Sequence, residues 1–316
     1  MSANELPIDI SAYGSYARGS ALADFLEVVA LTSGEARKVD LEATIRKAGW
    51  YRLNRGMFTR DPGIEPTESV EDEEGLEDPD DPDWPDWTFA IIAERIDVLG
   101  DNYPFLVESD SLIPKDGASA SAYVRLLALT VAHAYKAQIR SDPRRAFELI
   151  VVEALAAIGL RAYGMGTATS NGRAFATELV AATAAVGLTA ASPPVPAKTF
   201  AKDAGVDAIG VYNWEDRRPG QVVLIAQATL AESERWEAKI AEPRPHHWVQ
   251  YVNEILHPLA ALAVPHHVER EHLRWLTSPT AFVFDRLRLV PLISHETQDD
   301  AEAVDWLLGR DARVVR

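Results

Sequence analysis

Residues 201–230, AKDAGVDAIGVYNWEDRRPGQVVLIAQATL, decide the fold of the C-terminal half of the chain. Residues 206–214 and 221–230 are rich in β-branched and aromatic side chains, which favours two strands. Residues 216–220 between them contain Asp, Pro and Gly, the residues typical of turns. The stretch therefore predicts a β-hairpin.

The hairpin brings two oxygen-bearing side chains together at the end remote from its turn. Antiparallel pairing about the turn places Asp207 opposite roughly Ala228. Because side chains alternate between the faces, Gln227 and Thr229 lie on one face, close to Asp207. Mg²⁺ prefers hard oxygen ligands and keeps several waters, so a carboxylate and an amide oxygen form a minimal cradle for it.

A helix that precedes the hairpin supplies a third candidate ligand. Asp142 and Pro143 favour a helix start, because Asp caps free backbone N–H groups and Pro is tolerated in the first turn. Gly159 closes this helix. Glu148 lies at the edge of its apolar stripe, where a carboxylate can lean over a sheet, whereas Glu153 faces away. The stripe consists of Phe147, Ile150, Val151, Ala154, Leu155 and Ile158.

The other elements of the C-terminal half follow from the spacing of apolar residues. Residues 173–186 predict a second helix, and residues 231–241 predict a third that carries Lys239. Residues 247–262 contain apolar segments with helical character, and residues 280–292 predict a strand. We therefore expect an α/β domain over residues 139–316, in which a mixed sheet is flanked by helices.

The first 138 residues predict a mainly helical domain. Helical spacing occurs in four stretches, residues 21–31, 41–47, 87–99 and 120–136. Residues 65–86 hold many acids and no Lys or Arg, and they show no period of a helix or strand. Such a segment buries too little apolar surface to offset its chain entropy, so we expect a flexible acidic loop. The alternative is an acidic segment that mimics DNA or binds a partner.

Three of these features together resemble a known group of enzymes. Phe147-Glu148 on the first helix, the run Asp203-Ala204-Gly205-Val206-Asp207 at the first strand, and Gln227 on the second are similar to the Mrr-type branch of the PD-(D/E)xK nuclease superfamily. Members carry an acid on a first helix, an Asp at a strand, and Glu-x-Lys or Gln-x-Lys on the next strand. The resemblance covers about residues 145–239 and implies a restriction-endonuclease-like fold.

The resemblance implies a Mg²⁺-dependent DNA endonuclease, with Mn²⁺ as a possible substitute, that acts in restriction or defence against foreign DNA. Glu148, Asp207 and Gln227 would hold metal and water. The chain departs from the pattern at Thr229, which stands where the family has a lysine that offsets charge in the transition state. Lys239 could supply this ammonium group from the next helix, and Lys202 is a second candidate.

Other interpretations of the same residues stay open. Asp207 could belong to an ordinary turn, Gln227 could be a structural hydrogen-bonding group, and Glu148 could be a solvated charge at a helix edge. With Thr229 in place of lysine, the domain could be an inactive subunit for DNA binding or complex assembly. A third possibility is a helical interaction protein that is unrelated to nucleases.

The charge of the chain bears on its partners. The formal net charge is −17, and a protein that binds DNA alone usually presents a basic surface. Part of the excess is concentrated in residues 65–86. We expect DNA as a partner, approached either through a local groove or with the help of a protein partner or a second copy of the chain. The arginines considered for such a groove are Arg217, Arg218, Arg286 and Arg288.

Composition excludes several other classes. The chain has no cysteine, which excludes disulfides, thiolate zinc sites and cysteine nucleophiles. The N-terminus shows no signal peptide and no apolar run is long enough for a bilayer, so we expect a cytoplasmic protein that does not bind membranes. Histidines at 246, 247, 266, 267 and 272 lack the spacing of a zinc site, and the chain has no nucleotide-binding or G-x-S-x-G motif.

Overall fold

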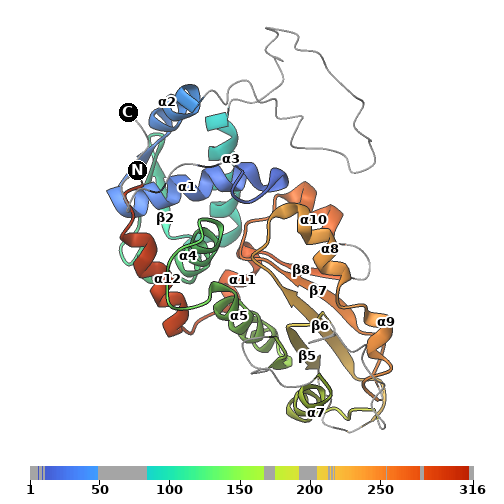
Figure 1. Ribbon diagram of the computed structural model, residues 1–316. Helices are drawn as coiled ribbons and strands as arrows, with labels where there is room; N and C mark the ends of the chain where they lie inside the picture. The colour runs from blue at the N-terminus through green and yellow to red at the C-terminus, as the bar shows by residue number, and fades with distance from the viewer. Residues whose placement is uncertain are drawn as a thin grey trace, which may run out of the picture.

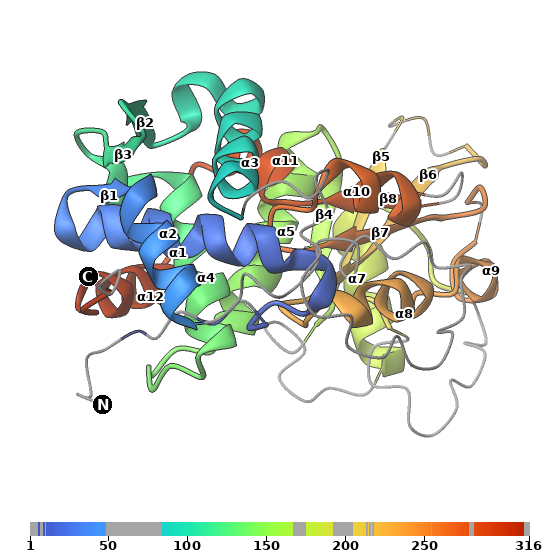
Figure 2. The ribbon, with the colours of Figure 1, turned by 90° about the horizontal axis from the view of Figure 1, so that it is seen from above.

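The computed structural model describes residues 6, 9, 11–48, 84–166, 175–191, 205–212, 214, 216, 218–253, 255–277 and 281–312. The fold is mixed α/β, with a three-stranded and a five-stranded sheet. Figures 1 and 2 show the five-stranded sheet at one side of the molecule and the N-terminal helices at the other.

The five-stranded sheet has the order β4-β5-β6-β7-β8. The strands are β4 (Arg161–Gly164), β5 (Ala208–Tyr212), β6 (Val222–Ala228), β7 (Leu259–Ala263) and β8 (Ala281–Phe284). The first three strands pair antiparallel, whereas β6, β7 and β8 pair parallel. Parallel neighbours need crossover connections, and the helices α8 (Trp236–Ala241) and α10 (Arg270–Leu276) lie in them.

The predicted hairpin is formed by β5 and β6, but its register differs by one residue from our expectation. Ala208 pairs with Ala226, and the Asp207 N–H donates to the Ala226 carbonyl over 2.8 Å. Continuing this register places Asp207 opposite Gln227 rather than Ala228. The expected position assumed a symmetric turn, and the sequence of a loop this long does not fix its exact pairing.

Helices cover both faces of the sheet. The helix α5 (Pro143–Ala157) begins as predicted, because the Asp142 side chain accepts a hydrogen bond from the Arg144 N–H. Its apolar stripe packs with Ala208, Leu224 and Ala226 on one face, except for Ile158, which follows the end of the helix and is 45% exposed. The other face, with Ile209, Val211, Val223 and Ile225, packs against α7 (Phe175–Val186) and α9 (Pro245–Trp248).

Two sequence predictions in the C-terminal half are wrong in part. Among the described residues of 247–262, only 247 and 248 are helical, as the last two residues of α9, and residues 259–262 belong to β7. A short apolar run buried between two parallel strands has the same composition as a buried helix, so periodicity could not separate them. Residues 280–292 form β8 only over Ala281–Phe284. Asp285 then caps the Arg288 N–H and begins α11 (Arg286–Leu289), followed by the 3₁₀ turn η7 (Val290–Leu292).

The N-terminal region is mainly helical, as predicted. Its helices are η1 (Ser15–Ala17), α1 (Arg18–Ser33), α2 (Lys38–Ala48), α3 (Trp84–Leu99), η4 (Gly100–Asn102), η5 (Ala118–Ala120) and α4 (Ala122–Ala134). A small antiparallel sheet, β1-β3-β2, was not predicted. It consists of β1 (Ala36–Arg37), β2 (Phe105–Glu108) and β3 (Ser111–Pro114), strands too short for a detectable pattern.

Of the acidic run 65–86, residues 65–83 lie outside the described residues, and residues 84–86 begin α3.

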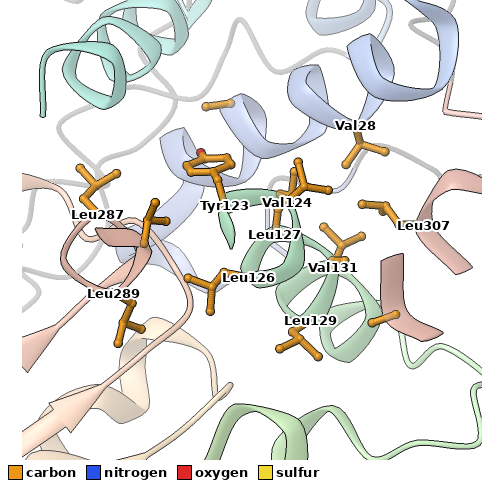
Figure 3. Packing of buried hydrophobic residues seen from close by; sticks show 14 of the residues in the cluster. Val28, Tyr123, Val124, Leu126, Leu127, Leu129, Val131, Leu287, Leu289 and Leu307 are labelled. Carbon is orange, nitrogen blue, oxygen red and sulfur yellow. The ribbon is translucent and has the colours of Figure 1, made fainter. Parts of the chain in front are cut away.

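One hydrophobic cluster crosses the predicted domain boundary at residue 138. It joins α4, whose Tyr123 and Leu127 are fully buried, to α1, α5 and the sheet. The C-terminal helix α12 (Gln298–Leu308) returns to pack on α4. Figure 3 shows side chains of α4 between Val28, Leu307 and the α11 residues Leu287 and Leu289. The two parts expected from the sequence are therefore packed together around α4.

Four buried charges also join these parts. Arg286 makes two hydrogen bonds of 2.7 Å to the Asp24 carboxylate, and Arg95 contacts Asp24 at 2.8 Å and Glu27 at 2.7 Å. Tyr103 and Tyr123 each donate a hydroxyl hydrogen bond to Glu27. Burial opposes ionisation of Asp24, but Arg286 and Arg95 outweigh it and lower the pKa of Asp24 to about 2. The expectation that Arg286 lines a DNA-facing groove is wrong, because its guanidinium is fully buried in this network.

We expect Arg286→Met to lower the free energy of unfolding by roughly 3–5 kcal/mol, because it removes one partner of a buried ion pair and leaves Asp24 under-compensated. Urea unfolding of the purified variant measures this. Arg274→Met, a change at an exposed helix position, serves as the control and should stay within about 0.5 kcal/mol of wild type. An equally small effect at Arg286 would contradict the role given to the network.

His266 and His267 are buried beside this network as neutral rings, and His272 is half-buried against Trp236. Burial and the nearby Arg286 lower the pKa of His266 to about 3. Burial and Arg95 lower the pKa of His267 far below its usual value, and burial lowers that of His272 to about 4. The pKa of Asp285 shifts in the opposite direction, because burial raises it to about 6.

These shifts predict that acidification destabilises the fold. The unfolded chain protonates histidine near pH 6.5, whereas the native rings stay neutral, so the unfolded state binds more protons and stability present above about pH 6.5 is lost as pH falls. Each ring contributes up to roughly 1.4 kcal/mol per pH unit. The carboxyls of Asp285 and Glu27, whose pKa values burial raises, oppose this and offset only part. Urea midpoints on both sides of this pH test the slope. His266→Gln should flatten it, and the exposed His257→Gln should not; equal slopes for wild type and His266→Gln would refute the assignment.

Candidate functional site

Asp207 and Gln227 are in direct contact at the end of the hairpin remote from its turn. The Gln227 Nε2 donates to Asp207 Oδ2 over 2.6 Å, and the Ala228 N–H donates to the same oxygen over 2.8 Å. Both side chains are buried, with 6% of Asp207 and 7% of Gln227 exposed. Asp207 immediately precedes β5 and Gln227 lies near the end of β6, so the backbone register of the hairpin brings them together.

The amide of Gln227 is only half satisfied. With its Nε2 bonded to Asp207, its Oε1 is buried and has no hydrogen-bond donor among the described residues. A buried acceptor without a partner costs roughly 1–3 kcal/mol. The oxygen therefore has bonding capacity for a donor or a cation.

Glu148 reaches the same end of the sheet from α5. Its side chain is 8% exposed, and its carboxylate lies against Gly166, where a Cβ atom would stand 2.5 Å from Oε2. The N–H groups of Met165 and Gly166 donate to the Asp207 carbonyl over 2.7 and 3.0 Å. Glu148 is thus connected to Asp207 through the backbone that follows β4. Glu153 faces away, as expected, and accepts the Ser294 and His295 N–H groups.

Thr229 and Lys239, the residues that bear on the missing strand lysine, both have partners away from Asp207. The Thr229 N–H donates to the Ala263 carbonyl over 3.0 Å, and its Oγ1 accepts the Ala231 N–H over 3.1 Å, so Thr229 shapes the turn after β6. The Nζ of Lys239 on α8 pairs with the Glu242 carboxylate at 2.9 Å. In the described part of the chain Lys239 makes no bond to Glu148, Asp207 or Gln227. Lys202, Asp203 and Arg217 lie outside the described residues.

A further buried acid lies on the same face of the sheet and was missed in the sequence. Glu178, in the first turn of α7, is 2% exposed and accepts a hydrogen bond from the Tyr163 hydroxyl over 3.0 Å. Tyr163 pairs with Ile209, and Ile209 shares its face with Asp207, two residues away. The signal for Glu178 was its place on the apolar face of a helix, where an acid is unusual.

The carboxylates do not form a metal site by themselves. Within the described ranges, no three His, Asp or Glu side chains are grouped as a metal ion would require. Any cation at Asp207 would therefore need ligands beyond carboxylates, such as the amide oxygen of Gln227 and water. Of the histidines considered in the sequence, His266 packs edge-on to Tyr13 and His272 stacks on Trp236.

Comparison with known proteins gives no relative. No protein-family profile, no curated protein and no solved structure matches the chain. Over the described residues, no helix combines the length and the apolar composition that a membrane crossing requires.

The close approach of Glu148 to Gly166 can be tested by a double-mutant cycle. A methyl group at residue 166 would displace the Glu148 carboxylate, so Gly166→Ala should destabilise the protein by roughly 1–3 kcal/mol. In a Glu148→Ala background the methyl group has room, and the same change should cost much less. Urea unfolding of the four proteins gives the coupling energy. Additivity within about 0.5 kcal/mol would show that the two residues do not interact.

Proposed function

We propose that the chain is a Mg²⁺-dependent DNA endonuclease of the Mrr-type PD-(D/E)xK branch, with a restriction-endonuclease-like fold, acting in restriction or defence against foreign DNA. The observation that carries the proposal is the buried contact between Asp207 and Gln227. A carboxylate and an under-bonded amide oxygen meet at the ends of two neighbouring strands, at the positions that the resemblance implies.

The residues present fit a hard cation. Asp207 supplies carboxylate oxygens, Gln227 an Oε1 with no donor among the described residues, and Glu148 a second carboxylate near the backbone of Gly166. Oxygen donors of this kind suit Mg²⁺ or Mn²⁺, with water completing the coordination. A metal bound there would polarise the phosphate and lower the pKa of an attacking water.

The order of these residues along the fold supports the same proposal. The acid lies on the helix before the sheet, the Asp at the start of β5 and the Gln on the adjacent strand β6. The charge that the family's lysine supplies would come from Lys239 after a change of its partner, or from Lys202. The partners proposed are DNA and either a protein subunit or a second copy of the chain.

Thr229 favours a second candidate function. Because its hydroxyl accepts the Ala231 N–H and Lys239 is paired with Glu242, no ammonium group lies at Asp207 among the described residues. A nuclease-fold subunit without activity, serving DNA binding or complex assembly, would retain the cation-binding oxygens and lack cleavage. Metal binding and cleavage therefore have to be measured separately.

Asp207→Asn should abolish Mg²⁺- or Mn²⁺-dependent cleavage of plasmid and single-stranded DNA, because it removes the ligand charge with little change in volume. It should also abolish the rise in melting temperature that either metal gives the wild-type protein. Asp305→Asn, the same change on the exposed side of α12, should leave both readouts unchanged.

The two readouts separate the two candidate functions. If Asp207→Asn cleaved DNA as fast as the wild-type protein, the site would be rejected. A metal-dependent rise in melting temperature that requires Asp207, without cleavage by the wild type, would select the inactive subunit.

A further inference from the structure

The connection between α4 and α5 is basic in a strongly acidic protein. Residues 133–145, HAYKAQIRSDPRR, contain four cationic side chains and one carboxylate, a net of +3, whereas the whole chain carries −17. The four cationic residues, Lys136, Arg140, Arg144 and Arg145, are all exposed. We call them the basic connection.

The basic connection adjoins Glu148. Arg144 and Arg145 precede it by four and three residues on the same helix, and side chains at these separations are neighbours on one helix face. Both arginines lie in the first turn of α5, where the helix dipole adds a partial positive charge. Glu148 turns inward against Gly166, while the arginines one turn earlier point into solvent.

The guanidinium groups of Arg144 and Arg145 make no hydrogen bond to the described residues. Their side chains are 68% and 58% exposed, and their nearest carboxylates are Asp142 at 3.6 Å and Asp299 at 3.9 Å, too far for a hydrogen bond. Glu302, the other acid nearby, accepts the Arg140 and Ser141 N–H groups. By contrast, the guanidinium groups of Arg95 and Arg286 donate hydrogen bonds to the buried carboxylates of Glu27 and Asp24.

We propose that the basic connection binds the sugar–phosphate backbone of duplex DNA and holds it next to Glu148, Asp207 and Gln227. The choice of DNA rests on the proposed function. The binding surface itself rests on the exposed cations. An arginine fork matches a phosphate in two parallel hydrogen bonds, and each neutralised phosphate releases counterions. A local basic surface also explains how a chain with net charge −17 could approach a polyanion.

The experiment is an anisotropy titration of a short labelled duplex with full-length protein, in EDTA to prevent cleavage, over a series of salt concentrations. Arg144→Ala/Arg145→Ala should make the slope of log K against log salt shallower by about 2, since two phosphate contacts are lost. Arg270→Ala/Arg274→Ala removes the same charge from two exposed positions on α10. This control should keep the wild-type slope.

The outcomes separate this surface from the proposed function. An unchanged slope in Arg144→Ala/Arg145→Ala, an equal loss in the control, or no salt-dependent binding by the wild type would overturn the proposal. Binding of polyglutamate as tightly as duplex would assign the surface to acidic proteins instead and overturn it too. A lost slope with intact cleavage by Asp207→Asn would support the surface while rejecting the catalytic site, because the titration needs neither metal nor cleavage.

Discussion

The pairing of Asp24 and Glu27 with Arg95 and Arg286 is the constraint on which the fold depends. Two acids and two arginines are removed from water, and such charges are tolerated only if each finds its partner and its hydrogen bonds. Arg286 meets this demand with Asp24 and the Pro265 carbonyl, and Arg95 with Asp24 and Glu27. Because the partners come from α1, α3 and the start of α11, neither end of the chain satisfies its charges without the other.

The same pairing fixes the place where the candidate site forms. The Arg286 Nε bond to Pro265 and the Arg286 N–H bond to the His266 carbonyl hold the turn after β7. β7 lies beside β6, and the Thr229 N–H donates to the Ala263 carbonyl at the strand end. The strand ends are therefore held by backbone bonds on both sides. Asp207 and Gln227 face each other because of this register, with their own hydrogen bond adding to it.

The sequence predicted the parts of the site that depend on local structure. The cap at Asp142, the stripe that places Glu148 at its edge, and the hairpin with Asp207 and Gln227 all follow from patterns within about thirty residues. What failed depends on distant partners. The register was off by one, β7 had the composition of a buried helix, and the pairing of Asp24 with Arg286 joins residues at opposite ends of the chain. Glu178 was missed because its burial follows from how α7 packs on β4.

The buried polar clusters around Asp24 and around Asp207 differ in a way that bears on function. In the network around Asp24, guanidinium and hydroxyl donors balance the carboxylate acceptors, so its bonds are closed and it stabilises the fold. Around Asp207 the balance is different. The Gln227 amide donates to Asp207, and its buried Oε1 has no donor among the described residues. A cluster with an excess of acceptor oxygens gains from a positively charged partner, and a closed cluster does not. For this reason the proposed chemistry lies at Asp207 and Gln227, although the network around Asp24 contains more charge.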